Sequence, residues 1–483
     1  MGYNLGAMFA LLHGYHLGGS GSNYWTRYMA RALCQLGESF LLACLEENPE
    51  DFDFISHVYE ARSGEKPRLL LERETPYPGR CHFLRLPIGK ILPVYVSDYL
   101  RPGSITLPMT KMTDTQIENY LQEMEEVLKE AVPFFNITAF HANHAVLLSV
   151  VAQRLGAINK LPYTVMPHGS ALEYVVKKDP RYFRLAESAL QNARKIFCLG
   201  QEMEVRLLNI FPTLPPLEKR LRKITLGVDT QAFQPVPRNE RGPKIRQLIA
   251  EIGNFGKREK ATRKPLPTAG KALGRMDWKQ EKIILHVGAL LPNKGLPVLL
   301  ETLPEVLKRI PQAKLLIVGS GPLLEELKHQ YRNWKDRFEF LGYFPHDLLR
   351  LLFPCADVAV FPSLIPEAGP LVFLEALASG VLPLGTDAGG MRGFFRTMEG
   401  SIPRKEVNKM RLDRDPKKIK AGLSKAIPWA LETGEEFSPL LRRVAVENFD
   451  WKVPAEIFRK TLHLLGSGNA QNLQTHPKNG LET

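Results

Sequence analysis

Short apolar runs alternate with stretches of helical periodicity along most of this chain. In its second half, the predicted strands are Lys282–Gly288, Lys314–Gly319, Phe338–Leu341, Val358–Phe361 and Leu382–Gly385. The predicted helices between and after them are Leu296–Arg309, Pro322–Asn333, Asp347–Phe353 and Pro370–Ser379. Strands that alternate with helices at this spacing predict a parallel sheet covered on both faces.

The first half shows the same alternation less regularly. Its predicted strands are Ala7–His13, Phe40–Cys44, Asn136–His141 and Tyr163–Met166, and its predicted helices are Asn23–Gly37 and Thr115–Ala131. Thr115 and Glu118 form a candidate capping box for the second helix, and Pro133 is its predicted stop. We therefore expect an α/β fold with two doubly wound, Rossmann-like domains that bind ligands at the carboxyl ends of their strands.

The chain has 483 residues, which is too long for one hydrophobic core. We predict an N-terminal domain over residues 1–235, followed by a basic interdomain insert or linker over 236–279. A C-terminal domain over 280–450 comes next, then an amphipathic helix over 451–465. The remainder, 466–483, is polar and predicted to be a disordered tail.

Composition places the protein among soluble globular chains, with 44% hydrophobic and 24% charged residues. No apolar run reaches the roughly 18 residues that span a bilayer. The apolar N-terminal segment lacks a basic region before it, so we expect a first strand and not a signal peptide. Five widely spaced cysteines without a Cys-x-x-Cys pair favour a reducing compartment. We expect a cytoplasmic location, with the inner face of the membrane as a candidate peripheral site.

The formal net charge is +13, which suggests an anionic partner. Residues 236–279 contain twelve Lys and Arg against four Asp and Glu, eight of the thirteen net charges. This segment is either a solvated linker or a surface that docks to anionic lipid headgroups or to a phosphorylated acceptor. Nucleic acid is not an expected partner, because the only aromatic residues in the segment, Phe255 and Trp278, do not interleave its basic residues.

Two carboxylates eight positions apart, Glu367 and Glu375, carry the most informative chemistry. A turn built from Pro and Gly follows Glu367 and precedes an apolar run that contains Glu375. If Pro370 is the first helical residue, its missing N–H costs nothing there. The free amides around Gly369, Pro370 and Leu371 would then form an anion site. Backbone amides that bind phosphate, flanked by two carboxylates that bind hydroxyl groups, suit a sugar nucleotide.

This stretch resembles the Glu-x7-Glu signature of retaining glycosyltransferases of the group-1 family (family 4). The resemblance implies a GT-B fold, in which two Rossmann-like domains face a central cleft and a C-terminal helix crosses back to the first domain. It extends over nearly the whole chain through three further motifs, Ile224–Pro235, Leu316–Pro322 and Asp387–Gly390.

The loop from Val287 to Gly295 resembles the family's diphosphate loop, and Lys294 matches its lysine. A hydrated ammonium is a suitable partner for phosphate. Ala289 stands where the family has an arginine, and losing one such charge-assisted contact costs about 1.5–3 kcal/mol. A second departure is Gly369, which follows Glu367 by two positions instead of three.

Glycines and one histidine complete the resemblance. It implies that Gly288, Gly319 and Gly321 bind the donor, and that Gly18, Gly19 and Ser20 form a loop that faces the diphosphate and the acceptor. His168, at the end of a predicted strand, matches a histidine that lines the donor-sugar site.

His141 and His144 have the spacing of a metal-binding pair, but no carboxylate or cysteine cluster completes a ligand set. We expect no required metal and no cofactor other than the donor substrate.

The resemblance implies a retaining hexosyltransferase that moves a sugar from a nucleotide-diphosphate donor to a hydroxyl of a glycan, lipid or small molecule. Glu375 would bind ribose, Glu367 the donor sugar and Lys294 the diphosphate. The alternatives are a phosphorylase or synthase of the same architecture, and a sugar-nucleotide-binding relative that has lost catalysis. Base, sugar, acceptor and oligomeric state stay open.

Overall fold

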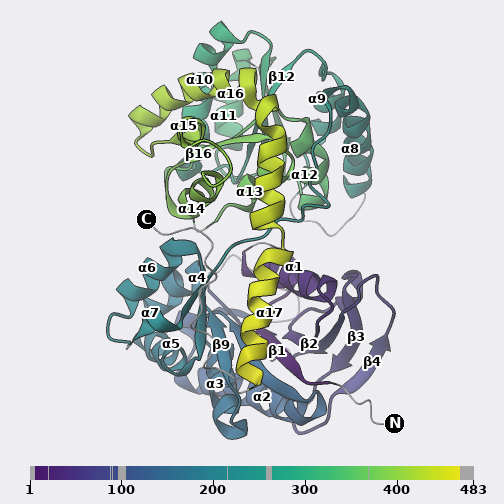
Figure 1. Ribbon diagram of the computed structural model, residues 1–483, viewed down its shortest axis with the longest axis vertical. Coiled ribbons are helices and arrows are strands. Elements are labelled where there is room, and N and C mark those ends of the chain that lie inside the picture. Colours follow the sequence, from purple (N-terminus) through teal and green to yellow (C-terminus); the bar gives the residue numbers. More distant parts are fainter. Residues whose placement is uncertain are drawn as a thin grey trace. The chain divides into compact units, whose positions relative to one another are not determined.

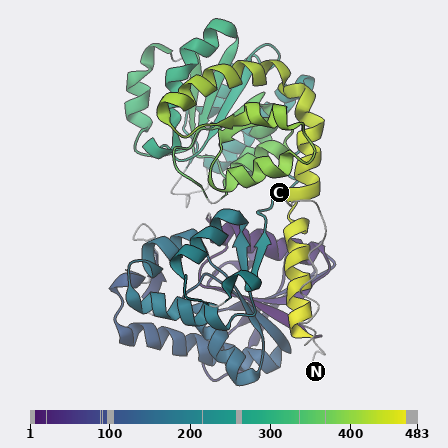
Figure 2. The ribbon, with the colours of Figure 1, turned by 60° about the vertical axis from the view of Figure 1, so that its left-hand side comes forward.

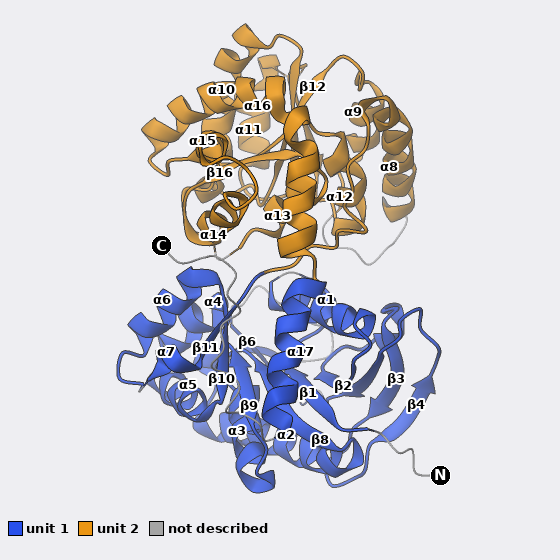
Figure 3. Ribbon diagram, in the orientation of Figure 1, with its two compact units in different colours: residues 1–225, 452–483 blue, residues 226–451 orange. Residues whose placement is uncertain are grey.

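The structure is a computed structural model that describes residues 6–19, 21–87, 89, 91–95, 105–214, 216–256, 264–334, 336–367 and 369–467. The chain forms two compact units (Figure 3). Unit 1 comprises residues 1–225 and 452–483, and unit 2 comprises residues 226–451. All five cysteines are free and buried.

Unit 1 is built on a nine-stranded sheet in the order β11-β10-β9-β8-β1-β2-β5-β3-β4 (Figure 1). Neighbouring strands are parallel except β3 and β4. The strands are β1 (Met8–His13), β2 (Ser39–Cys44), β3 (Ile55–Glu60), β4 (Arg68–Glu72), β5 (Arg80–Arg85), β8 (Ile137–Asn143), β9 (Tyr163–Met166), β10 (Lys195–Leu199) and β11 (Leu221–Ile224). A separate two-stranded sheet holds β6 (Ile91–Val94) and β7 (Ile105–Pro108).

The helices of unit 1 are α1 (Ser22–Gln35), α2 (Asp114–Phe134), α3 (Leu148–Asn159), α4 (Gly169–Ala171), α5 (Pro180–Asn192), α6 (Gly200–Ile210), α7 (Leu217–Arg220) and α17 (Lys452–Gly466). The capping box of α2 is formed by Thr113 and Gln116, two positions before the predicted pair. Asp114 thereby becomes the first helical residue, where a carboxylate favours the helix dipole. Pro133 lies inside the last turn instead of ending the helix.

Unit 2 is built on a six-stranded parallel sheet in the order β14-β13-β12-β15-β16-β17. Its strands are β12 (Lys282–Val287), β13 (Ala313–Val318), β14 (Phe338–Gly342), β15 (Val358–Phe361), β16 (Leu382–Thr386) and β17 (Arg411–Leu412). Its helices are α8 (Arg241–Gly256), α9 (Ala269–Gly274), α10 (Leu296–Arg309), α11 (Leu324–Gln330), α12 (His346–Leu352), α13 (Leu371–Ala378), α14 (Gly389–Met398), α15 (Arg404–Met410) and α16 (Pro416–Val444). Helices cover both faces of the sheet (Figure 2). The doubly wound prediction is confirmed for both units.

The segment 236–279 belongs to unit 2, whereas its composition predicts an interdomain insert or linker. Ile245 and Leu248 of α8 and Leu273 of α9 are buried in the core of unit 2. Arg241 Nη1 lies 3.0 Å from Oδ1 of Asp357, at the start of β15. The high charge of the segment conceals this apolar helical face in the sequence, which explains the difference. Part of its positive charge, at 257–263, lies outside the described residues.

Helix α17 completes unit 1, as the fold prediction requires. Phe458 is fully buried, and its ring contacts those of Phe9, Trp25 and His141. Arg459 and His463 both bond to Glu38, over 2.9 and 2.8 Å. The predicted tail falls, from residue 468 on, outside the part of the chain that the structure describes.

Candidate functional site

The residues of the predicted signature lie at the carboxyl edge of the unit 2 sheet, where the strand order reverses. β12 and β15 are neighbours, but β13 follows β12 on one side and β16 follows β15 on the other. Lys294 lies in the connection after β12, and Glu367 lies in the connection after β15. Loops that diverge from such a point form the usual ligand position of an open α/β sheet.

These two connections are bonded to each other. The backbone N–H of Leu364 donates to the carbonyl oxygen of Asn293 over 2.9 Å. Nζ of Lys294 lies 2.6 Å from Oε2 of Glu367, and the two side chains are 23% and 21% exposed. A partly exposed ion pair contributes little to stability, so each partner can exchange to a ligand at low cost.

A glycine turn after β16 contacts the backbone of Glu367. Gly390 donates its N–H to the carbonyl oxygen of Glu367 over 2.7 Å. Gly389 has a φ of 53°, and a Cβ there would collide with the same carbonyl oxygen. The Asp387–Gly390 motif thus acts by fixing the backbone of a signature carboxylate.

Glu375 lies on α13 and is 1% exposed. Its Oε1 is hydrogen-bonded to Nδ1 of His346, at the first residue of α12. Its Oε2 is buried and has no hydrogen-bond partner in the described structure. A buried carboxylate oxygen without a donor is costly, so this atom is a candidate ligand acceptor. His346 is missing from the sequence prediction, and its position just after a strand and Pro345 is the signal for it.

The start of α13 differs from the prediction. Pro370 is the N-cap with an extended backbone, and the helix begins at Leu371. Gly369 precedes the cap and packs against Leu226, while Ala368 is not among the described residues. The amides of Gly369 and Leu371 still flank the amino terminus of α13, where unpaired donors gather.

His286, on β12, is a second residue that sequence reasoning misses. It is 2% exposed. Its Nδ1 lies 2.9 Å from the carbonyl oxygen of Val360. Because a carbonyl oxygen only accepts, Nδ1 is the donor of this bond. Nε2 of the neutral ring is therefore able to accept a hydrogen bond. That Nε2 is buried and lacks a partner in the described ranges. Burial lowers its pKa to about 4; the hydrogen bond to Val360 and the charge of Glu367 raise this pKa by less, and the charge of Lys294 lowers it further. The signal for His286 in the sequence is a lone histidine inside an apolar strand.

The predicted glycines of unit 2 bring the ends of β12 and β13 together. Gly288 donates its N–H to Val318 over 3.0 Å. Gly319 has a φ of 147°, and a Cβ there would collide with the carbonyl oxygen of Gly288. A Cβ at Gly321 would lie 2.5 Å from the carbonyl oxygen of Leu290. These residues shape the loop that carries Lys294.

In unit 1, the predicted glycine loop precedes α1. Asn23 Nδ2 donates to the carbonyl oxygen of Gly18 over 2.8 Å, and Gly19 has a φ of 96°. His13, at the end of β1, donates from Nε2 to Oδ1 of Asn23 over 3.1 Å. Ser20 lies outside the described residues.

Histidines gather at the carboxyl edge of unit 1, again where strand order reverses, between β1 and β8. His13 ends β1, His144 follows β8 and His168 follows β9. All three are buried. The rings of His144 and His168 are 4.6 Å apart, and Nε2 of His168 lies 3.5 Å from Oδ1 of Asn143. Burial lowers the pKa of His13 to about 4 and that of His168 to about 3, which makes these rings neutral hydrogen-bonding groups.

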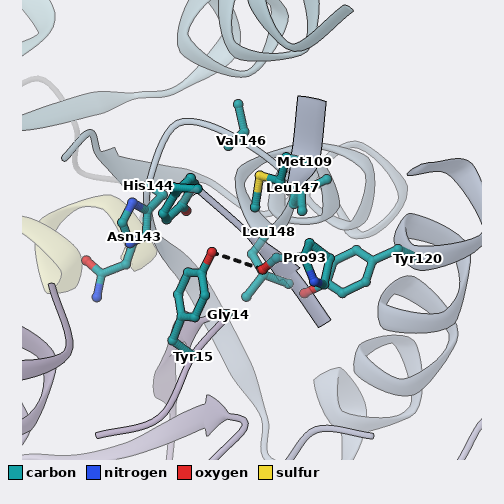
Figure 4. Close-up of a pocket in the computed structure, with 11 residues that line it drawn as sticks. Gly14, Tyr15, Pro93, Met109, Tyr120, Asn143, His144, Val146, Leu147 and Leu148 are labelled. Carbon is teal, nitrogen blue, oxygen red and sulfur yellow. Dashed lines mark hydrogen bonds between the residues drawn. The ribbon is translucent and has the colours of Figure 1, made fainter. Parts of the chain in front are cut away.

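A small pocket opens beside this cluster (Figure 4). The rings of Tyr15, Tyr95, Tyr120 and His144 line it, with aliphatic side chains between them. The hydroxyl of Tyr15 donates to the carbonyl oxygen of Pro93 over 3.1 Å. His144 has a φ of 73°, a strained backbone of the kind found at functional sites.

In the described part of the chain, His141 and His144 do not join any group of three or more side chains suited to a metal ion. The His141 ring is engaged by Thr164, with Nδ1 and Oγ1 2.8 Å apart. Among all the residues that the structure describes, no helix is both long and apolar enough to cross a membrane.

Residues 276–410 match the family model of glycosyl transferases group 1. An uncharacterized glycosyltransferase of Methanocaldococcus jannaschii is 38% identical over 25% of this chain and 30% of its own length. The phosphatidyl-myo-inositol mannosyltransferase of Mycobacterium tuberculosis is 31% identical over 39% of this chain and 49% of its own length. The chain thus matches half or less of each of these curated relatives.

The whole chain has a known architecture. Sucrose-phosphate synthase from Thermosynechococcus elongatus superposes with a TM-score of 0.60 and 19% identity, over 96% of this chain and 100% of that one. Residues 276–410 are therefore similar to the glycosyl transferases of group 1, and the chain that carries them has the GT-B fold, with two Rossmann-like domains.

Proposed function

We propose that this chain is a retaining glycosyltransferase that moves a hexose from a nucleotide-diphosphate sugar to an acceptor hydroxyl. The observation that carries the proposal is the Lys294–Glu367 pair. Two connections bring these side chains to 2.6 Å at the reversal point of a sheet, inside the region similar to the glycosyl transferases of group 1.

Donor binding would open this ion pair. Lys294 would exchange its carboxylate partner for an oxygen of the diphosphate, because an ammonium forms strong charge-assisted bonds to phosphate. Glu367, released from Lys294, would accept hydrogen bonds from hydroxyls of the donor sugar. One exchange would thereby supply both contacts.

Glu375 would bind the ribose. Its Oε1 is held by His346, which leaves Oε2 as the buried acceptor that lacks a donor in the described structure. A ribose hydroxyl would satisfy that atom. Gly288, Gly319 and Gly321 would contribute indirectly, by shaping the Lys294 loop.

In the transfer step, the bond between the anomeric carbon and the phosphate oxygen would break, and its electron pair would go to the diphosphate. The acceptor oxygen would bond to the same face of that carbon, and its proton would pass to the departing phosphate. Lys294 and the amides of Gly369 and Leu371 would stabilise the developing charge, which is often the largest catalytic contribution. This route uses no metal.

In unit 1, His168 and the loop of Gly18, Gly19 and Ser20 would serve the donor sugar and the acceptor. The acceptor would be a glycan, a lipid or a small molecule. Peripheral contact of the basic segment 236–279 with an anionic membrane stays a prediction.

Substitution of Lys294 tests the proposal against a matched control. Lys314 forms a similar pair with Glu281, with Nζ and Oε1 3.1 Å apart, on β13. Lys294→Ala should lower transfer by roughly 100- to 1,000-fold, as the loss of a donor to developing charge does, and Lys314→Ala should change it less than about threefold. Equal effects in folded proteins would remove Lys294 from the mechanism.

The second candidate is a relative that binds a sugar nucleotide without transfer, and Ala289 favours it. In that case nucleotide sugars would raise the melting temperature, and Lys294→Ala would reduce the shift, but the wild-type chain would consume no donor. A phosphorylase or synthase would show itself by a requirement for phosphate or a sugar phosphate.

A further inference from the structure

The imidazole of His286 lies where the pairing of β12 with β15 ends. The last paired residues of these two strands are Leu285 and Ala359. One residue further along, the ring itself bridges the strands, since Nδ1 donates to the carbonyl oxygen of Val360. This bond fixes the orientation of the ring and leaves Nε2 as a hydrogen-bond acceptor.

That acceptor lacks a donor. His286 is 2% exposed, and its Nε2 is buried without a hydrogen-bond partner among the described residues. Burial lowers the pKa of the ring to about 4, so Nε2 carries no proton at neutral pH. A buried acceptor without a donor is costly, and a ligand that supplies a donor would remove that cost.

The position beside Nε2 holds no side chain, because residue 288 is a glycine. A Cβ at Gly288 would lie 3.5 Å from Nε2 of His286. Apart from the two chain neighbours of Gly288, no other described residue lies within 4 Å of that Cβ position. The glycine thus leaves room for a ligand atom next to the unpaired nitrogen.

The charged pair of the candidate site acts on the same ring. The negative charge of Glu367 raises the pKa of His286, and the positive charge of Lys294 lowers it. In the proposed function, Glu367 accepts hydrogen bonds from hydroxyls of the donor sugar. A sugar held there would bring further hydroxyl groups close to Nε2.

We propose that Nε2 of His286 accepts a hydrogen bond from a hydroxyl group of the donor sugar, and that this contact selects donors that carry this hydroxyl. The contact rests on the proposed function, in which Glu367 holds the same sugar, and it adds a residue that determines which sugars are accepted. A neutral imidazole accepts from a hydroxyl, whereas fluorine in place of the hydroxyl supplies no donor. A site with such a buried acceptor rejects the analogue, because the acceptor stays unpaired.

Calorimetric titration of the full chain tests this proposal. UDP, GDP and ADP are titrated first. The glucose and mannose conjugates of the nucleotide that binds are then compared with analogues in which fluorine replaces one hydroxyl of the sugar at a time. In the wild-type chain, we expect at least one analogue to bind about tenfold more weakly than its parent.

Two amide variants separate this contact from a structural role of the ring. His286→Asn keeps a donor near the position of Nδ1, for the bond to Val360, but has no acceptor at the position of Nε2. His286→Gln reaches the position of Nε2 with an acceptor but gives up the bond to Val360. The preference for the hydroxyl should fall below about threefold in His286→Asn and persist in part in His286→Gln. A structural role alone predicts the opposite order, with His286→Gln the more harmful change.

Gly288→Ala tests the space beside the ring. The added Cβ meets Nε2 at an ordinary contact distance, so the melting temperature should stay close to that of the wild type. The methyl group occupies the proposed position of the hydroxyl, and the preference should therefore be lost. His329→Asn, at an exposed position of α11, is the control and should leave every affinity unchanged.

The outcomes for the nucleotide and for the sugar are separate. Equal binding of all analogues by the wild type would overturn the proposal, even if the nucleotide alone binds. So would a preference that persists in both His286→Asn and Gly288→Ala. If none of the three nucleotides binds to the folded chain, the proposed function and this contact fail together.

Discussion

The two sheets reverse their strand order in the same way but present opposite chemistry at that point. In unit 2, the connections after β12 and β15 bring together a cation and a carboxylate, each about one-fifth exposed. In unit 1, β1 ends in a buried histidine, and β8 and β9 are each followed by one; burial lowers the pKa of all three. One topology thus offers exchangeable charge in one unit and neutral hydrogen-bonding rings in the other.

The difference indicates a division of labour. Charged partners in partial contact with water suit a diphosphate, which brings its own charge. Neutral, desolvated imidazoles suit hydroxyl groups, because they can donate or accept without the cost of burying an ion. Under the proposed function, unit 2 would therefore hold the charged diphosphate, and the neutral rings of unit 1 would contribute hydrogen bonds to hydroxyl groups of the donor sugar and the acceptor.

A fall in pH is expected to produce the largest difference in stability between the two units. Burial lowers the pKa of His13 to about 4 and that of His141 and His168 to about 3. The unfolded chain binds protons to these residues near pH 6.5, so the stability of unit 1 falls as the pH drops from there toward 4. By pH 5, each fully buried histidine costs on the order of 2 kcal/mol.

Calorimetry between pH 7 and pH 5 would measure this loss. We expect the unit 1 transition to shift down more than that of unit 2, in which burial lowers the pKa of His286. His13→Gln, which cannot be protonated, should flatten part of the dependence. Parallel shifts of the two transitions would contradict the comparison.

Gly319→Ala tests whether the glycines of unit 2 act by shaping the Lys294 loop. The φ of 147° and the collision with Gly288 should destabilise unit 2 by about 3 kcal/mol. Gly393, on α14, has nothing within 4 Å of the Cβ position, and Gly393→Ala should be neutral or stabilising. Equal melting temperatures for the two variants would refute the structural role of Gly319.

Glu375→Gln is expected to have a smaller effect. The amide keeps the size of the side chain but replaces one acceptor oxygen with a donor nitrogen. Affinity for the nucleotide should fall about tenfold, which corresponds to one strong hydrogen bond, and calorimetric titration would measure it. Glu432→Gln, at an exposed position of α16, is the control. Unchanged affinity in Glu375→Gln would exclude ribose binding by this carboxylate.

The smallest predicted effect concerns the docking of α17 and has the opposite pH dependence. The hydrogen bond to Glu38 raises the pKa of His463. The contribution to stability is therefore complete below pH 6.5 and is lost as the pH rises through the raised value. With the side chain 55% exposed, it amounts to a few tenths of a kcal/mol. Hydrogen exchange of α17 should be faster at pH 8 than at pH 6 after correction for intrinsic rates, and Glu38→Gln should abolish the difference.

Most of the fold of unit 2 can be predicted from the sequence, because the parallel strands of this unit are continuous apolar runs separated by regular helices. Helix α10 has the predicted bounds, Leu296–Arg309. The short strands of unit 1 are harder to find. β4 is exposed along its whole length and therefore lacks the apolar alternation that marks a strand.

For the candidate site, the spacing of Glu367 and Glu375 leads to the carboxyl edge of the unit 2 sheet, but it does not identify the residues that contact these carboxylates. The bond from His346 to Glu375 depends on a contact between two helices 29 positions apart in the sequence. The partner of Lys294 is 73 positions away. Sequence spacing cannot reveal such pairs, since the order of the strands brings them together.

The central claim is that the carboxyl edge of unit 2 binds a nucleotide diphosphate. Hydrogen exchange of the full chain, with and without UDP, GDP or ADP, tests it most directly. We expect one nucleotide to protect residues 289–295 and 369–375, and Lys294→Ala to weaken that protection. Protection confined to unit 1, or none with any nucleotide in folded protein, would contradict the account.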